Sequence, residues 1–265
     1  MRYILPCLAI IAIASILESC GGKPSEDNAK DSLLIDYTVV NTLPHNTESY
    51  IQGLVIHDNK ILESTGQPGQ EGQSWIAEVN PATGAHDKKV LLDEAYFGEG
   101  ITILNNKIYQ LTWTTKKGFI YDAKTYKQLR TFEYPMEGWG LTHNNAELIM
   151  SDGTEKIHFK DTATLADIRT INVTENGKPV KHLNELEFID GFIFANVWQT
   201  NLILKIDPSN GNVVGKLDCT QLTERARGMY PNAEVLNGIA YDKNSKALLI
   251  TGKLWPQAFL IKLKK

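Results

Sequence analysis

A pattern of two short strands joined by a tight turn recurs five times along this chain of 265 residues. The clearest copy consists of two alternating runs, residues 186–189 and 192–197, which flank Asp190 and Gly191. An Asp-Gly pair in this setting favours a two-residue type I′ turn, because both central residues of that turn need positive φ. The pattern therefore predicts an antiparallel hairpin, and its recurrence predicts a fold built from repeated hairpins.

The spacing of the repeats indicates the kind of fold. The other four copies turn at Asp58-Asn59, Asn105-Asn106, Asn144-Asn145 and Asn244-Ser245. Equivalent positions are Gly53, Gly100, Gly140, Glu187 and Gly238, which gives steps of 47, 40, 47 and 51 residues. A period of about 40–50 residues with four strands per unit is typical of a β-propeller. We predict an all-β fold, a five-bladed β-propeller; a β-sandwich is the alternative, but it does not explain the period.

The ends of the chain are expected to close the ring. The fifth unit has a third strand at residues 259–263 and lacks a fourth, whereas a spare strand is predicted at residues 35–40. Pairing this N-terminal strand with the last blade would cover both exposed strand edges. From residue 33 onward we find almost no helical periodicity, so we predict a single propeller domain over residues 33–265.

The N-terminus predicts export. Residues 1–19 contain a charged residue, an apolar run and small residues near a cleavage point, which are the features of a signal peptide. Cys20 follows directly, as in the lipobox of bacterial lipoproteins, where this thiol is diacylated. Glu18 departs from the usual lipobox, so an ordinary signal peptide with an incidental cysteine is the alternative. Residues 20–32 read as a flexible tether. We expect a protein that is lipid-anchored in the bacterial cell envelope, in the periplasm or at the outer membrane.

Composition excludes several classes of function. The net charge is −4 and no basic stripe is present, which argues against binding of nucleic acid. After the signal peptide, no run approaches the roughly 20 apolar residues that span a bilayer. We therefore expect membrane contact through the lipid alone.

The cysteines and histidines offer no metal or disulfide framework. Lipidation of Cys20 and loss of Cys7 would leave Cys219 alone, which we expect to be a small buried hydrophobe. The histidines lack metal-ligand spacing and are expected at surfaces or turns. They are His45, His57, His86, His143, His158 and His182. We predict that no metal or other cofactor is required, and leave open a structural cation on the propeller axis.

The hairpin ends opposite the turns are expected to carry the functional site, because the first strand of each blade lines the axis. These ends carry Gln52, Glu63, Glu99, Trp113, Trp139, Asp152, Asn184, Glu185, Trp198, Asn237, Lys253 and Trp255. Four of the five tryptophans lie among them. Such clustering predicts a pocket with apolar walls and a few polar groups. The alternative is that the tryptophans are scattered through the core.

These ends also carry motifs that resemble a known family. The motifs include Tyr50-Ile51-Gln52-Gly53, Phe97-Gly98-Glu99-Gly100, Gly138-Trp139-Gly140, Leu183-Asn184-Glu185, Asn196-Val197-Trp198 and Thr251-Gly252-Lys253. In this order they resemble the glutamine cyclotransferase family, the plant-type glutaminyl cyclases, over about residues 43–263. The resemblance implies a five-bladed propeller. It also implies an enzyme that converts the N-terminal glutamine of peptides or proteins to pyroglutamate and releases ammonia.

The resemblance further implies roles for individual residues. Glu99 would be the proton shuttle, and Lys253 and Asn184 would bind the oxyanion and the carboxamide. Gln52 would fix the substrate backbone or amine, and the pocket walls would be Trp113, Trp139 and Trp198. The carboxylates expected only to hydrogen-bond at blade ends are Glu63, Asp152 and Glu185. Trp255 is expected either in the pocket or as a cap on the last blade.

Two departures from the family pattern affect the rim. Ile51 stands where the family usually has threonine, and residues 67–73 replace a shorter turn that contains tyrosine. We expect these changes to affect peptide preference more than chemistry.

Two further classes of function compete with a monomeric cyclase acting on peptides. A non-catalytic propeller that binds peptides or glycans could keep the tryptophans, but would have no use for Glu99 together with Lys253 and Asn184. A propeller hydrolase or lyase should show paired carboxylates or a metal cluster at the axis.

Overall fold

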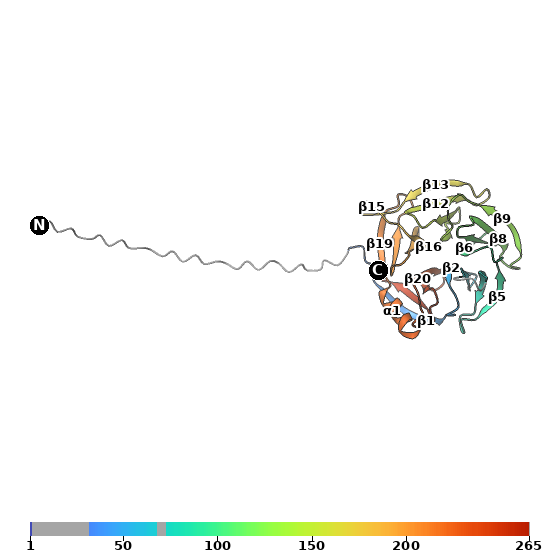
Figure 1. Cartoon of the computed structure of the whole chain (residues 1–265), viewed down its shortest axis with the longest axis horizontal. Coiled ribbons are helices and arrows are strands. Elements are labelled where there is room, and N and C mark those ends of the chain that lie inside the picture. Colours follow the sequence, from blue (N-terminus) through green and yellow to red (C-terminus); the bar gives the residue numbers. More distant parts are fainter. Residues whose placement is uncertain (2–31, 68–72, 265) are drawn as a thin grey trace. The chain divides into compact units, whose positions relative to one another are not determined.

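Five four-stranded antiparallel sheets are arranged in a ring around a central axis (Figure 1). The computed structural model describes residues 1, 32–67 and 73–264, and one compact unit comprises Leu33–Lys265. The predicted signal peptide after Met1, Cys20 and the tether up to residue 31 lie outside the described residues. Within the described residues, no helix is long and apolar enough to cross a membrane. The all-β, five-bladed propeller predicted from the repeat is confirmed.

In four of the blades, the strands follow each other in sequence from the axis outward. Blade 1 contains β2 (Ile51–His57), β3 (Lys60–Thr65), β4 (Trp75–Val79) and β5 (His86–Leu91). Blade 2 contains β6 (Gly98–Leu104), β7 (Lys107–Thr112), β8 (Lys117–Asp122) and β9 (Gln128–Glu133). Blade 3 contains β10 (Leu141–His143), β11 (Glu147–Ser151), β12 (Lys156–Asp161) and β13 (Asp167–Asn172). Blade 4 contains β16 (Leu183–Ile189), β17 (Phe192–Val197), β18 (Leu202–Ile206) and β19 (Val213–Asp218).

Blade 5 joins the two ends of the chain. Its inner strands are β20 (Leu236–Asp242), β21 (Ala247–Gly252) and β22 (Gln257–Leu263), and β1 (Tyr37–Pro44) is the outermost strand. β1 pairs antiparallel with β22, from Tyr37 opposite Leu263 to Pro44 opposite Gln257, and lies beside the red strands of the last blade in Figure 1. Closure by an N-terminal strand is thus confirmed. The strand begins later than predicted because residues 33–35 pair with β19 of blade 4 instead. It also ends later, because its pairing with β22 continues to Pro44.

The hairpin turns of blades 1, 2 and 4 have the two-residue conformation that their sequences predict, whereas those of blades 3 and 5 have four residues between the paired strands. Asp190 and Gly191 have φ of 48° and 87°, and Asp58 and Asn59 have φ of 48° and 62°. Positive φ at both central residues defines the type I′ turn, whose twist matches that of the flanking strands. These tight turns fix the register of the innermost strand pair and hence the direction in which its side chains point.

The hydrophobic core is divided among the blade interfaces. Five clusters of buried apolar residues lie between neighbouring blades, and each contains residues from both. The cluster between blades 5 and 1 has the fewest buried members, among them Ile51, Leu54 and Leu249. This interface also contains buried polar side chains, notably His45 and Glu63.

Two elements were not predicted. The connection between blades 4 and 5 contains the helix α1 (Thr220–Met229), of which Leu222, Thr223 and Ala226 are buried. Its N-terminal Cys219 makes no side-chain capping bond, and the Thr220 amide instead donates to Asp218 Oδ1 at 2.9 Å, one residue ahead of the usual capping position. Cys219 itself is free and buried, as expected. A two-stranded ribbon, β14 (Thr174–Glu175) and β15 (Lys178–Pro179), precedes blade 4.

The expectation that all histidines occupy surfaces or turns is wrong for three of them. His45, His86 and His158 have buried side chains that contact the carboxylates of Glu63 or Asp152. A buried imidazole with an acidic partner leaves no periodic signal in the sequence, because the partner comes from another strand.

Candidate active site

A β-bulge recurs at the start of the innermost strand in four blades. The strand register shifts after Ile51, Gly98, Leu183 and Leu236, at the end of each strand opposite its hairpin turn. The residues in these bulges include Gln52, Glu99, Asn184 and Asn237. A bulge takes a residue out of regular pairing and redirects its side chain, and such bulges are common beside active sites. The propeller thus presents a polar side chain from each of four blades at the same end of the axis.

Glycines beside these residues allow neighbouring blades to approach closely. The Gly100 amide donates to the Trp139 carbonyl at 2.7 Å, and a Cβ atom at Gly100 would lie 2.5 Å from the same oxygen. The Ser151 hydroxyl accepts from the Gly140 amide and donates to the Asn184 carbonyl, both at 2.7 Å. These contacts fix the backbones of blades 2, 3 and 4 relative to one another. Any side chain at Gly100 would separate Glu99 from Trp139.

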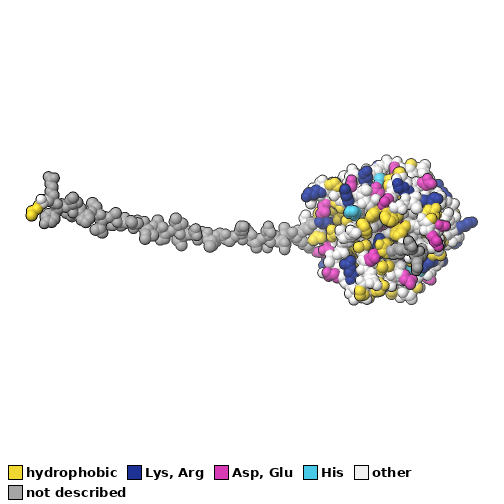
Figure 2. All heavy atoms as spheres, viewed as in Figure 1, with side chains coloured by type: hydrophobic (Ala, Val, Ile, Leu, Met, Phe, Trp, Pro, Cys, Tyr) yellow, Lys and Arg dark blue, Asp and Glu magenta, His cyan; other side chains and the backbone are white. Residues whose placement is uncertain are grey.

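A cavity of about 240 Å³ lies where these strand ends meet. Its lining residues are Tyr50, Gln52, Phe97, Glu99, Trp113, Trp139, Asn184, Trp198 and Lys253. All seven residues that the sequence places in the site are among them. Drug-sized ligands occupy pockets of about 300–1,000 Å³, so this cavity suits a single side chain. In the space-filling view, hydrophobic side chains gather near the centre of the visible face and charged ones lie around them (Figure 2).

The apolar wall of the cavity consists of two aromatic groups. The rings of Tyr50, Phe97 and Trp113 follow one another with centroids 6.5 and 5.7 Å apart. On the other side, Trp139 and Trp198 meet edge to face at 5.6 Å and an angle of 86°. Edge-to-face contacts of this kind hold aromatic rings in fixed orientations. The cavity therefore has rigid apolar walls on two sides.

One carboxylate joins the two aromatic groups. Glu137 Oε2 accepts hydrogen bonds from the indole nitrogen of Trp113 at 2.7 Å and from that of Trp139 at 3.0 Å. Trp113 is 40% exposed and lies at the rim, so packing alone would not hold its ring. Glu137 thus restrains both tryptophans. It also adds a negative charge beside the cavity.

Glu99 is the buried carboxyl of the cavity, with 4% of its surface exposed. Gln52 Nε2 donates to Glu99 Oε1 at 3.1 Å, and Asn237 Nδ2 in turn donates to Gln52 Oε1 at 3.3 Å. Burial raises the pKa of Glu99 well above its usual value; the charge of Lys253 opposes this shift, and that of Glu137 adds to it. A carboxyl with a raised pKa can both release and accept a proton near neutral pH.

Lys253 is the buried cation of the cavity. Burial lowers its pKa to about 8, although the charges of Glu99 and Glu234 favour the protonated form. The ammonium lies 4.3 Å from the centre of the Tyr50 ring, in a cation–π contact. Its backbone pairs with the preceding loop, because Lys253 N donates to the Val235 carbonyl at 3.0 Å. The lysine is thus held in place while its charge stays sensitive to pH.

Asn184 offers an unused acceptor. Its side chain is buried, and its Oδ1 atom has no hydrogen-bond partner among the residues that the structure describes. Buried polar atoms are nearly always hydrogen-bonded, so an unpaired acceptor in a cavity wall indicates a ligand that brings a donor. An amide or amine group would supply one.

Comparisons with known proteins agree with this geometry. The sequence pattern of the glutamine cyclotransferase family matches residues 10–263 of the chain. The chain belongs to this family. A glutaminyl-peptide cyclotransferase of Arabidopsis thaliana is 37% identical over 233 residues, which cover 86% of this chain and 71% of the plant protein. The crystal structure of Myxococcus xanthus glutaminyl cyclase matches with a TM-score of 0.82 at 34% identity, over 88% of this chain and 99% of the other.

The other carboxylates near the family motifs have structural partners, as predicted. Glu185 accepts from the amides of Leu54 and Ile239, at 3.2 and 2.8 Å, and so connects blade 4 with blades 1 and 5. Asp152 contacts His158 at 3.0 Å. The lining of the cavity does not include Glu185, Asp152 or Glu63, so these three side chains are part of the scaffold.

Of the two places expected for Trp255, the structure shows the one in the last blade. Trp255 is fully buried in the core between blades 4 and 5, where its indole donates to the Glu234 carbonyl at 3.0 Å. It packs in the last blade and does not line the cavity, which leaves three tryptophans there. Sequence reasoning missed Glu137, because its link between two indoles depends on the packing of two blades and has no motif of its own.

The described residues offer no evident metal centre. No three His, Cys, Asp or Glu side chains among residues 32–67 and 73–264 are grouped so that they could hold a metal ion. We therefore assign no residue of the cavity to a metal or cofactor.

Proposed function

We propose that this protein is a glutaminyl-peptide cyclotransferase, which converts the N-terminal glutamine of peptides or proteins to pyroglutamate. The observation that carries the proposal is the buried carboxyl of Glu99 beside Lys253 in a cavity sized for one side chain, in a chain of the glutamine cyclotransferase family. The reaction is an intramolecular transfer of an acyl group from the side-chain amide to the α-amine. In class, the enzyme is an aminoacyltransferase.

The cavity would bind the glutaminyl residue in a folded conformation. Its rigid aromatic walls, formed by Trp139, Trp198 and the group around Trp113, leave room for the side chain to turn back toward its own amine. Asn184 Oδ1 would accept a hydrogen bond from the amide or the amine of the substrate. Holding the two reacting groups in a near-attack geometry can supply about 7–11 kcal/mol of barrier reduction.

Glu99 would move the proton. The neutral α-amine attacks the amide carbon, a C–N bond forms, and the carbonyl oxygen becomes an oxyanion. Glu99, whose raised pKa favours the protonated form, gives its proton to the amide nitrogen. The old C–N bond breaks and ammonia leaves as the carbonyl re-forms. The Glu99 carboxylate then takes a proton from the new ring nitrogen, which restores the acid and yields the lactam.

Lys253 would stabilise the oxyanion. As an ammonium in a buried site it is a strong electrostatic partner for a charge that develops only during the reaction. Gln52, which donates to Glu99, would keep the carboxyl oriented toward the reacting nitrogens.

The decisive experiment measures ammonia release from glutamine-capped peptides in EDTA, with a chain lacking residues 1–20. We expect release with a loss of about 17 Da from the peptide, the mass of ammonia expelled when the amine bonds the amide carbon. Glu99→Gln is expected to bind the peptide but to release ammonia at least about 100-fold more slowly. Binding by the parent with no release from any such peptide would leave a non-catalytic peptide-binding propeller.

We further propose that the protein acts as a monomer, anchored by lipid on Cys20 in the cell envelope. The support is the signal-like sequence before Cys20 and the tether composition after it. Labelled fatty acid should be incorporated into the parent chain and not into Cys20→Ala. Equal labelling of both would exclude this anchor.

A further inference from the structure

The turn that carries Lys253 has a strained backbone. Strand β21 ends at Gly252, Lys253 follows directly, and Leu254 has φ of +60°. This region of backbone conformation disfavours residues with a branched or bulky side chain. Such strain persists only where surrounding contacts enforce it, and it is concentrated at functional sites.

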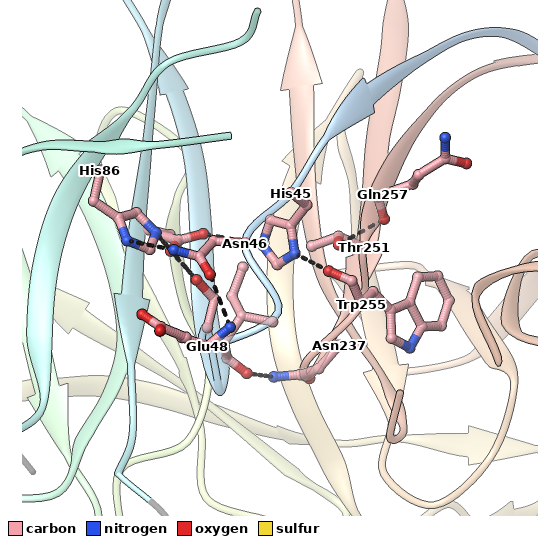
Figure 3. A network of polar contacts seen from close by, with 11 residues as sticks. His45, Asn46, Glu48, His86, Asn237, Thr251, Trp255 and Gln257 are labelled. Atoms are coloured by element: carbon pink, nitrogen blue, oxygen red, sulfur yellow. Dashed lines mark hydrogen bonds and ion pairs between the residues drawn. The ribbon is translucent and has the colours of Figure 1, made fainter. Parts of the chain in front are cut away.

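A short segment, residues 45–49, follows the closing strand β1 and supplies these contacts. The Leu254 amide donates to the Ser49 carbonyl at 2.9 Å, and the His45 amide donates to the Pro256 carbonyl at 3.1 Å. The His45 side chain adds a third bond, from Nδ1 to the Trp255 carbonyl at 2.7 Å. Figure 3 shows the imidazole of His45 pointing toward this carbonyl. The turn is thus fastened on both sides of Leu254.

The segment is in turn fastened to a buried carboxylate of blade 1. Glu63 is fully buried, and its Oε2 atom lies 3.1 Å from His45 Nε2. Its other oxygen accepts from the Ser49 hydroxyl at 2.6 Å and is also contacted by His86 Nε2. One carboxylate therefore holds both ends of the segment that restrains the turn.

The partners of His45 determine its protonation. A backbone carbonyl and a carboxylate can only accept hydrogen bonds, so both ring nitrogens of His45 must donate, which requires the imidazolium form. Burial opposes this charge, but the hydrogen bond and the charge of Glu63 outweigh it and raise the pKa of His45. Burial likewise raises the pKa of Glu63, but its hydrogen bonds from His45 and His86 lower it overall.

His86 provides an internal contrast. The amide of Asn46 donates to His86 Nδ1 at 3.4 Å, and its orientation follows from the bond that Glu48 N makes to Asn46 Oδ1. His86 Nε2 contacts Glu63 and the Ser49 hydroxyl, the latter at 3.1 Å, and its ring packs on Trp75. These contacts anchor the same carboxylate as His45 does, but none of them is made to a residue of the turn itself.

We infer that His45 is a positioning residue for Lys253. Its side chain contacts Glu63 on one side and the Trp255 carbonyl of the strained turn on the other. The turn is thereby kept in its conformation, and the ammonium of Lys253 stays at the cavity. Without this contact the turn relaxes away from the left-handed conformation at Leu254, and Lys253 is displaced. The inference rests on the proposed function, because it gives His45 an effect on turnover only where Lys253 contributes to turnover.

Two substitutions of His45 separate its two contacts. In His45→Asn, the amide nitrogen can take the place of Nδ1 and keep the bond to the Trp255 carbonyl. In His45→Gln, the longer side chain can take the place of Nε2 and keep only the contact with Glu63. His86→Ala is the matched control, because it weakens the anchoring of Glu63 without removing a bond to the turn.

The first readout is kinetic. We expect His45→Gln to lower kcat about 10- to 100-fold with a smaller change in KM, since small displacements of catalytic groups cost this much. His45→Asn should recover most of kcat, and His86→Ala should lower Tm while kcat stays close to that of the parent. Equal losses of kcat in His45→Gln and His86→Ala would overturn the inference, since His45 would then act through stability alone.

The second readout is independent of turnover. Hydrogen exchange at the Leu254 amide should accelerate in His45→Gln and stay protected in His45→Asn and His86→Ala. Unchanged protection in a folded His45→Gln would overturn the link between His45 and the turn. If the parent releases no ammonia at all, the proposed function fails, whereas hydrogen exchange still tests whether His45 holds the turn.

Discussion

Glu99 and Glu63 are both buried carboxyl groups on neighbouring blades, yet their pKa values shift in opposite directions. Glu99 is 4% exposed, and burial raises its pKa well above the usual value. Glu63 is 0% exposed, and although burial also raises its pKa, hydrogen bonds from two histidines lower it overall. Burial alone therefore does not decide the charge of these groups.

The difference lies in the hydrogen-bond donors around each carboxyl. Glu63 has two imidazoles and a serine hydroxyl, which together stabilise the carboxylate. Glu99 has one neutral amide, from Gln52, and a lysine that acts through its charge. The scaffold carboxylate is thus fixed in one protonation state, whereas the cavity carboxyl can change its state. This is the property that a proton shuttle needs.

The largest effect is expected from Glu99→Gln. Loss of the exchangeable proton should lower kcat roughly 100- to 10,000-fold, the usual contribution of general acid–base catalysis. Tm should stay constant or rise, because the amide removes a carboxyl that burial disfavours as an anion. Rapid-quench kinetics and thermal unfolding on the same sample would test both halves. A large fall in Tm would contradict the contrast with Glu63.

Glu63→Ala should show the opposite pattern, with its main effect on folding. Removing one partner of a buried ion pair typically costs about 3–5 kcal/mol, because the remaining charge loses its compensation. Urea unfolding at pH 7 would measure this loss in the free energy of unfolding. A loss below about 1 kcal/mol, the level of an exposed pair, would show that His45 and Glu63 are not charged.

The pH dependence of stability sharpens the same point. The folded-state pKa of Glu63 lies below its unfolded value, so its contribution is present above about pH 4.5 and is lost as the pH falls further. Glu63→Gln should therefore unfold with a weaker dependence on pH below about 4.5 than the parent does. Equal slopes in parent and variant would rule out a stabilised carboxylate at this position.

The pH profile of kcat/KM should reflect Lys253 on its alkaline side. Since burial lowers its pKa to about 8, oxyanion stabilisation is expected to fade as the pH rises through that value. The substrate α-amine must be neutral to attack and has a pKa of about 8, so the profile should be bell-shaped. Lys253→Arg should move the alkaline limb upward, because the guanidinium stays protonated. If the alkaline limb stays at the same pH in Lys253→Arg, a group other than Lys253 produces it.

The smallest effects are expected at Glu137. Glu137→Gln retains an oxygen acceptor for the indoles but removes the charge that helps raise the pKa of Glu99. Glu137→Ala frees both tryptophans, and losing two hydrogen bonds of about 1 kcal/mol each should raise KM roughly 5- to 30-fold. In the glutamine variant, KM should change little, whereas the pKa of Glu99 should fall, so that loss of activity through ionisation of Glu99 occurs at lower pH. A similar rise of KM in both variants would make the charge, and not the acceptor, the important feature.

Much of the fold could be predicted because its signals are local. The Asp190-Gly191 turn and the alternation around it specify a hairpin within about 20 residues of chain. The same pattern occurs five times, and its spacing indicates a propeller. Helix α1 escaped prediction because it is short and buries only Leu222, Thr223 and Ala226. The seven cavity residues could be named because the family motifs keep them at fixed places in each hairpin.

The sequence by itself determined the all-β class, the number of blades, the closing strand and the family, since each depends on periodicity or on contiguous motifs. Only the tertiary structure decided which buried groups carry charge. The carboxylate of Glu137 joins the indoles of blades 2 and 3, and His45 joins Glu63 of blade 1 to the Trp255 carbonyl of blade 5. Such contacts arise from the closing of the ring, which brings residues far apart in the chain to within hydrogen-bond distance, and no local pattern encodes them.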